Sequence, residues 1–120
     1  MSIINLLKSK IKVTKLPKKQ LSEIIAEAND AFFAIHDHIN TIVGIMDQSL
    51  RKQGMNADAV TIDCLSTKEK LVFVLHDIKP TMVDIALGNN EGDITTSYEY
   101  PLADITLDWV VTLMKNHFIS

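Results

Sequence analysis

A regular apolar period runs through residues 18–53 of this 120-residue chain, and it constrains the fold more than any other feature. The stretch contains no proline and a single glycine, Gly44. Spacings of 4, 3, 4, 3, 4, 3 and 4 separate its apolar residues Leu21, Ile25, Ala28, Phe32, Ile35, Ile39, Ile42 and Met46. This near-heptad period is typical of the seam of a long amphipathic helix. We therefore expect one helix over residues 17–53, with a length of about 54 Å.

Boundary signals stand at both ends of this predicted helix. Pro17 suits the first turn of a helix, and it disfavours helical angles in the residue before it. Arg51 and Lys52 would interact favourably with the C-terminal end of the helix dipole, and Gly54 can adopt the left-handed conformation that follows a helix. Residues 1–16 are accordingly expected to form a separate amphipathic arm, either helical or irregular.

Beyond residue 55 the apolar period becomes alternating, which predicts strands. Three or four strands are expected within residues 59–100, at 59–66 (strand or short helix), 71–75, 82–87 and 94–100. Gly and Asn at 88–92 predict a hairpin loop, because both residues tolerate positive φ. In the last strand, Ile94, Tyr98 and Tyr100 are expected to face inward.

A final helix is expected over residues 104–118, with Thr106 as a plausible N-cap. Because the connections between the predicted strands are short, neighbouring strands should pair antiparallel as a meander. The sequence therefore predicts an α+β fold in a single domain, residues 1–120. In this fold the long helix and the C-terminal helix pack on a small antiparallel sheet of three or four strands.

Composition limits where such a chain is expected to work. The only cysteine, Cys64, cannot form an internal disulfide. No apolar run approaches the roughly 18 residues needed for a membrane span, and the first residues do not resemble a secretory signal. We therefore expect a cytoplasmic protein.

The formal net charge of −3 conceals a strong asymmetry. Residues 1–20 contain no acid and six lysines: Lys8, Lys10, Lys12, Lys15, Lys18 and Lys19. From residue 21 onward there are fifteen acidic and six basic residues, a net charge of −9. The basic arm could bind an anionic membrane surface, contact nucleic-acid phosphates, or dock on the acidic body of its own chain or of a partner subunit. Nucleic acid is weakly supported, because the arm has neither Arg nor aromatic residues for base readout and stacking.

Candidate catalytic and metal-binding residues do not form a recognisable pattern. His36 and His38 would point about 200° apart on a helix, so they cannot share a metal ion there. His76 and His117 lie elsewhere, and Cys64 sits on the apolar side of its predicted strand. The carboxylate pairs Asp30 with Asp37 and Asp104 with Asp108 are expected to be solvated or explained by a helix start. We expect no catalytic residues, no metal and no cofactor.

The functional hypothesis follows from the length of the predicted helix. A sheet with strands of about 20 Å cannot cover the whole seam, so the remaining part is expected to pair with a second copy across a two-fold axis. The predicted interaction residues on this seam are Phe32, Ile35, Ile39, Ile42 and Met46. The sequence thus favours a small acidic, non-enzymatic, homodimeric protein-interaction module, such as an adaptor, a chaperone-like or an immunity-like protein. The alternative is a nucleic-acid or anionic-surface binding module that uses the Lys-rich arm.

Overall fold

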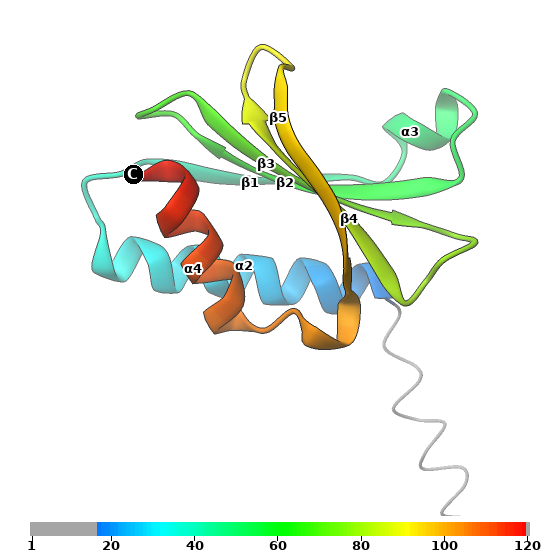
Figure 1. Cartoon of the computed structure of the whole chain (residues 1–120), viewed down its shortest axis with the longest axis horizontal. Helices are drawn as coiled ribbons and strands as arrows, with labels where there is room; N and C mark the ends of the chain where they lie inside the picture. Colours follow the sequence, from blue (N-terminus) through cyan, green and yellow to red (C-terminus); the bar gives the residue numbers. More distant parts are fainter. Residues whose placement is uncertain (1–16, 120) are drawn as a thin grey trace, which may run out of the picture.

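The computed structural model describes residues 17–119, and it has the predicted α+β class. Along the chain the elements are α2 (Pro17–Ile35), β1 (Thr41–Met46), α3 (Ser49–Lys52), β2 (Ala57–Cys64), β3 (Glu69–His76), β4 (Met82–Asn89), β5 (Ile94–Pro101), the 3-10 turn η1 (Leu102–Asp104) and α4 (Leu107–Phe118). The sheet has five strands in the order β1-β2-β3-β4-β5, and each neighbouring pair is antiparallel. The predicted meander is confirmed, but the prediction of three or four strands is wrong. Both long helices lie on the same face of the sheet (Figure 1).

The prediction of one helix over residues 17–53 is also wrong, because α2 ends at Ile35. The chain then turns through residues 36–40 and returns as strand β1. The segment Thr41–Met46 reads TIVGIM; its β-branched residues favour a strand, and its glycine disfavours a helix interior. The predicted stop at Gly54 has a structural counterpart, since Gly54 has φ +90° just after the single turn of α3.

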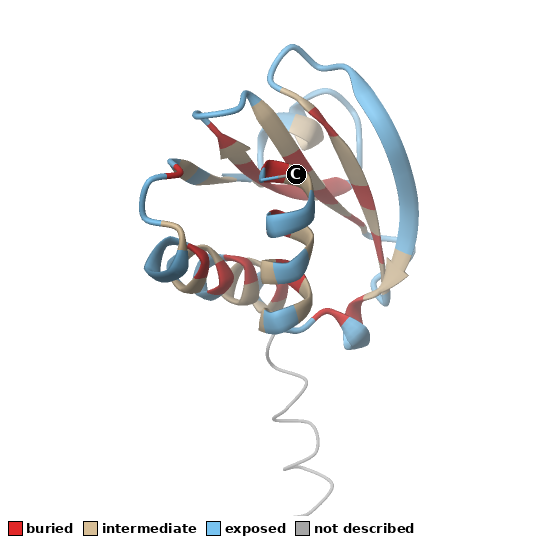
Figure 2. Ribbon diagram, turned by 60° about the vertical axis from the view of Figure 1, so that its left-hand side comes forward, coloured by how far each residue is buried: buried red, intermediate tan, exposed pale blue. Residues whose placement is uncertain are grey.

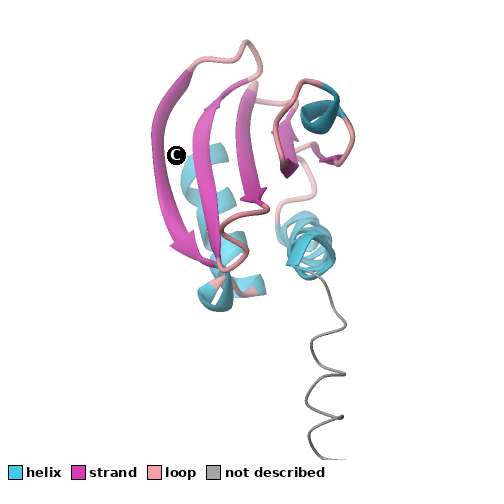
Figure 3. Ribbon diagram, turned by 90° about the vertical axis from the view of Figure 1, so that its right-hand side faces the viewer, coloured by secondary structure: helices cyan, strands magenta, loops and turns pink. Residues whose placement is uncertain are grey.

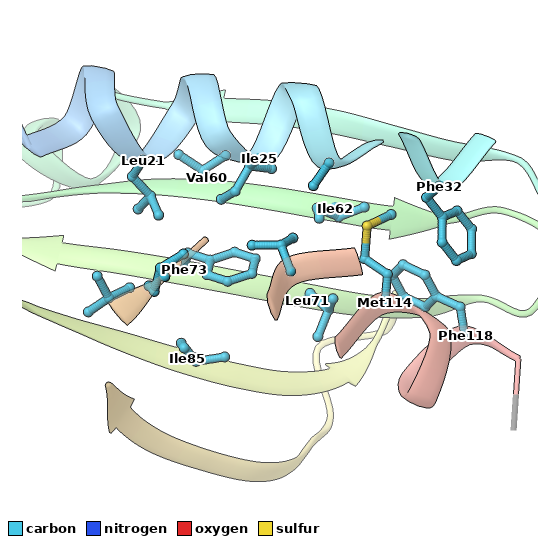
Figure 4. Close-up of a cluster of buried hydrophobic side chains, with 14 of the residues drawn as sticks. Leu21, Ile25, Phe32, Val60, Ile62, Leu71, Phe73, Ile85, Met114 and Phe118 are labelled. Atoms are coloured by element: carbon cyan, nitrogen blue, oxygen red, sulfur yellow. The ribbon is translucent and has the colours of Figure 1, made fainter. Parts of the chain in front are cut away.

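The first half of the predicted seam does form the buried face of α2. Leu21, Ile25, Ala28 and Phe32 are all buried against the sheet. From α4, Val110, Met114 and Phe118 enter the same core, in which the rings of Phe32 and Phe118 meet edge to face with centroids 6.2 Å apart. Figure 4 shows Phe32, Met114 and Phe118 converging with labelled inward residues of β2, β3 and β4, and Figure 2 shows the buried stripe along α2.

The start of α4 follows the sequence prediction closely. The Thr106 hydroxyl accepts a hydrogen bond from the backbone N–H of Trp109 at 3.2 Å, which satisfies a donor that the first helical turn would otherwise leave unpaired. The helix begins at Leu107, and the three residues Leu102–Asp104 before it form η1. The ring of Trp109 stacks on Tyr100 of β5 at a centroid distance of 4.4 Å, so α4 is attached to the last strand.

A β-bulge between β4 and β5 changes the direction of one predicted inward residue. The register shifts between Leu87 and Gly88, so that Ile94 pairs with Gly88. An extra residue in one strand reverses the alternation of its side chains beyond the bulge. Ile94 therefore lies on the face away from the helices, with 63% of its surface exposed, and the prediction that it faces inward is wrong. The segment predicted as strand or short helix at 59–66 is resolved as a strand, β2, over Ala57–Cys64.

Candidate interaction surfaces

The structure brings the rings of His36 and His38 within 6.3 Å of each other, but it does not gather the four histidines and Cys64 at one place. His36 and His38 lie in the turn after α2, whereas Nε2 of His76 lies 2.9 Å from Asp84 on β4. Nε2 of His117 lies within 3.1 Å of both the Gly88 carbonyl and a Glu69 carboxylate oxygen. Cys64 is buried in the core. Within residues 17–119, no three His, Cys, Asp or Glu side chains are grouped so that they could hold a metal ion.

Arg51 forms the most extensive ionic contact of the described chain. Its guanidinium donates to both carboxylate oxygens of Asp58, at 3.0 and 2.8 Å, and to both oxygens of Asp77, at 2.9 and 2.8 Å. These hydrogen bonds lower the pKa of the Asp77 carboxyl and raise the pKa of Arg51. The contact fastens α3 to the first residues of β2 and to the turn after β3.

An open hollow of about 320 Å³ lies beside this contact, between the start of α2 and the turn after β3. Its lining includes Pro17, Lys18, Arg51, Leu75, His76 and Pro80. Because two carboxylates already surround Arg51, the guanidinium is not available as a binding site for an anion. The sequence offered no signal for this arrangement, since its three charged members come from α3, β2 and a turn.

The face of the sheet away from α2 and α4 has an apolar centre. Cross-strand partners on this face form one row of Met46, Ala59, Val74 and Asp84 and a second row of Gly44, Thr61, Val72 and Ala86. Val72, Val74 and Ala86 are half-buried. Among the described elements, both long helices, α2 and α4, lie on the opposite face of the sheet (Figure 3). We call the half-buried residues Met46, Val72, Val74 and Ala86, together with the buried Ala59, the open-face patch.

Ion pairs border the open-face patch on both sides. Lys70 lies 3.7 Å from Asp63 at one end of the strands. At the other end, His76 contacts Asp84, and Lys79 on the following turn donates to Glu99 at 2.6 Å. The Lys79–Glu99 contact raises the pKa of the lysine and lowers the pKa of the glutamate. The patch is thus an apolar strip with ion pairs at both ends.

The five predicted seam residues do not share one surface. Phe32 and Ile39 are buried in the core, whereas 66% of Ile35 and 53% of Ile42 is exposed. Met46 is half-buried on β1. The prediction of a continuous helical seam, on which the expected self-association was based, is therefore wrong. The five residues are divided between a helix, a turn and a strand.

The basic arm falls mostly outside the described residues. Lys8, Lys10, Lys12 and Lys15 belong to residues 1–16, so their role in anion binding stays a prediction. Lys18 and Lys19 lie in the first turn of α2, where Nζ of Lys18 is 3.4 Å from an Asp47 carboxylate oxygen. Lys19 is exposed.

Comparison of the chain with models of protein families, with curated proteins and with solved structures finds no match in any of the three. In the part of the chain that the structure describes, no helix combines the length and apolar character required to cross a bilayer.

Proposed function

We propose that this chain is a non-enzymatic protein-interaction module, and that it binds an amphipathic helix of a partner protein on the open-face patch. The observation that carries this proposal is the apolar centre of a five-stranded sheet with long helices on only one face. Apolar side chains that remain accessible over several strands are typical of an interaction surface.

The shape of the patch favours a helix as the partner. Ala59 on β2 and Ala86 on β4 have small side chains and flank Val72 and Val74 on β3, so little side-chain bulk stands beside the two valines. The opposite face of the same sheet already accepts two amphipathic helices through the apolar residues of β2, β3 and β4. A third helix with apolar residues at i, i+3, i+4 and i+7 would pack on the open-face patch by the same principle. Its charged flanks would meet Lys70 with Asp63 on one side and Lys79 with Glu99 on the other.

A displayed library of amphipathic helical peptides tests the proposal with a defined probe. Peptides selected on the full chain should carry the i, i+3, i+4, i+7 apolar pattern. Their affinity should fall at least tenfold for Val74→Glu, which places a charge at the centre of the patch. Ala34→Glu adds the same charge on the exposed side of α2 and should leave the affinity unchanged.

Val72→Thr provides a second variant in which folding is less perturbed, and it should weaken the same peptides moderately. Thermal unfolding of each variant establishes that it is folded. If no selected peptide is sensitive to Val72 or Val74, the open-face patch is not the binding surface. Binding that appears only after deletion of residues 1–16 would also overturn the proposal, because it would assign the patch to the chain's own arm.

A further inference from the structure

Strand β1 is an edge strand without the features that usually prevent edge-to-edge pairing. Its sequence TIVGIM contains no charged residue and no proline, and 53% of Ile42 and 54% of Ile45 is exposed. Natural edge strands are commonly protected by charges, proline or a bulge, because their free backbone groups can pair with another strand. An unprotected edge of this kind is a candidate site for strand addition.

The other edge of the sheet is protected in all of these ways. Strand β5 reads ITTSYEYP, carries Glu99 in an ion pair with Lys79, and ends at Pro101. It also pairs with β4 through the bulge at Gly88. The two edges of the sheet therefore differ: β5 is protected against pairing with another strand, and β1 is not.

The backbone groups of β1 that face outward can be identified from its pairing with β2. The N–H of Leu65 donates to the carbonyl of Asn40 at 2.8 Å, so this pair is hydrogen-bonded. Hydrogen-bonded and non-bonded pairs alternate along an antiparallel ladder. With the observed register, Ile42 and Gly44 direct their backbone groups toward β2, whereas Val43 and Ile45 direct theirs outward. No described residue bonds the outward backbone groups of Val43 and Ile45.

We propose that β1 pairs antiparallel with β1 of a second copy across a two-fold axis at Gly44, which joins the two sheets into one continuous sheet. In this register Val43 lies opposite Ile45 of the second copy, and both have outward backbone groups, so they exchange two hydrogen bonds. Ile42 lies opposite Met46 of the second copy on the other face. Each exposed isoleucine thereby gains an apolar cross-strand partner.

The register at Gly44 is favoured over its neighbours by the same pattern. A shift of one residue would place outward backbone groups opposite inward ones, which breaks the ladder. A shift of two residues moves the axis to Val43 or to Ile45, which places Ile42 opposite Gly44 or opposite Gln48 of the second copy and so removes its apolar partner. The axis at Gly44 also brings two glycines together at a non-bonded position, where the chains approach most closely.

Neighbouring groups are compatible with this pairing. Asp47, the acid next to the end of β1, lies opposite Thr41 of the second copy and is already paired with Lys18, so no two acids face each other. Below the strand, the contact of Asn29 with Thr41 places that side of α2 against β1. Ser22, Ala26 and the half-exposed Phe33 share this side at helical spacing, so these side chains would face the second copy's α2. A short strand and a helix flank belong to the small interfaces that give weak, concentration-dependent association.

Sedimentation of the full chain over a range of concentrations tests the pairing. The wild-type mass should rise from one chain to two, and Ile45→Lys should weaken dimerisation at least tenfold. Ile94→Lys is the matched control, since it changes an isoleucine that is at least as exposed on the opposite edge, and it should have no effect. A chain that stays monomeric up to millimolar concentration would overturn the proposal, as would a dimer that is insensitive to Ile45→Lys.

The register is tested by disulfide formation between two single variants in a Cys64→Ala background. Ile42→Cys and Met46→Cys should each remain uncrosslinked alone, and their mixture should form a covalent dimer on oxidation. This follows because residue 42 faces residue 46 of the other copy at a non-bonded pair, where the Cα separation suits a disulfide. Crosslinking of either variant alone, or none in the mixture, would refute the axis at Gly44.

Discussion

Two adjacent phenylalanines at the end of α2 provide a sharp test of the fold, because the structure assigns them opposite environments. Phe32 is fully buried between the sheet and Phe118, whereas half of Phe33 is exposed. Removing a buried Phe side chain costs about 3–5 kcal/mol of unfolding free energy, from lost burial and the cavity left behind. With a urea m-value of about 2 kcal/mol per molar, Phe32→Ala should lower the unfolding midpoint by about 1.5–2.5 M.

Phe33→Ala is the matched control for this substitution. Half burial of a Phe contributes about 1 kcal/mol, and the better helix propensity of alanine restores about 0.5 kcal/mol. The expected change in the midpoint is therefore about 0.25 M. Fluorescence of Trp109, which stacks on Tyr100 and must separate from it on unfolding, reports the transition. Equal midpoint shifts for the two variants, or a larger one for Phe33→Ala, would refute the assigned orientation of α2.

Two further predictions concern the Arg51 contact and the bulge. Arg51 lowers the pKa of Asp77 in the folded state, so as the pH falls the Asp77 carboxyl is protonated first in the unfolded state. The stability contributed by the Arg51–Asp77 contact is therefore present at neutral pH and is lost as the pH drops below about 4. Arg51→Gln should accordingly lower the urea midpoint at pH 7, and its deficit relative to wild type should shrink in acid; a deficit independent of pH would contradict the pairing. A Cβ at Gly88 would lie 2.0 Å from the Asp93 carbonyl oxygen, so Gly88→Ala should destabilise the fold by about 3 kcal/mol. Gly92→Ala, at φ +95° with open space around it, should cost about 1 kcal/mol in the same urea assay, and a reversed order would count against the bulge geometry.

The sequence predicts best those elements whose patterns are local. The buried face of α2, the Thr106 cap and the alternation in β2 and β4 each depend on residues within a few positions of one another. The prediction of one long helix was wrong for a reason that is also local. Ile42 and Met46 are four residues apart, and two positions with this spacing share a face both in a helix and in a strand. The β-branched residues of Thr41–Met46 favour the strand and Gly44 disfavours the helix, whereas the spacing is neutral.

Other features required contacts between segments distant in the sequence. The direction of Ile94 depends on the bulge, which forms where the chain at Asp93 approaches Gly88. The Arg51 contact joins two aspartates that lie 7 and 26 residues away. The open-face patch exists only because four strands, β1 to β4, align in one register. No periodicity within a single segment contains this information, so these features could not be predicted from the pattern alone.

Although residues 17–53 do not form one helix, a physical basis for self-association remains. Ile42 and Ile45 still expose apolar surface to water. On a helix, such residues would choose a partner through side-chain packing alone, and several offsets of the two helices would be nearly equivalent. On an edge strand, the backbone groups of Val43 and Ile45 impose an additional condition, because only registers that match outward donors with outward acceptors are allowed. The strand therefore makes a narrower prediction than the helix did, with residue 42 of one copy facing residue 46 of the other.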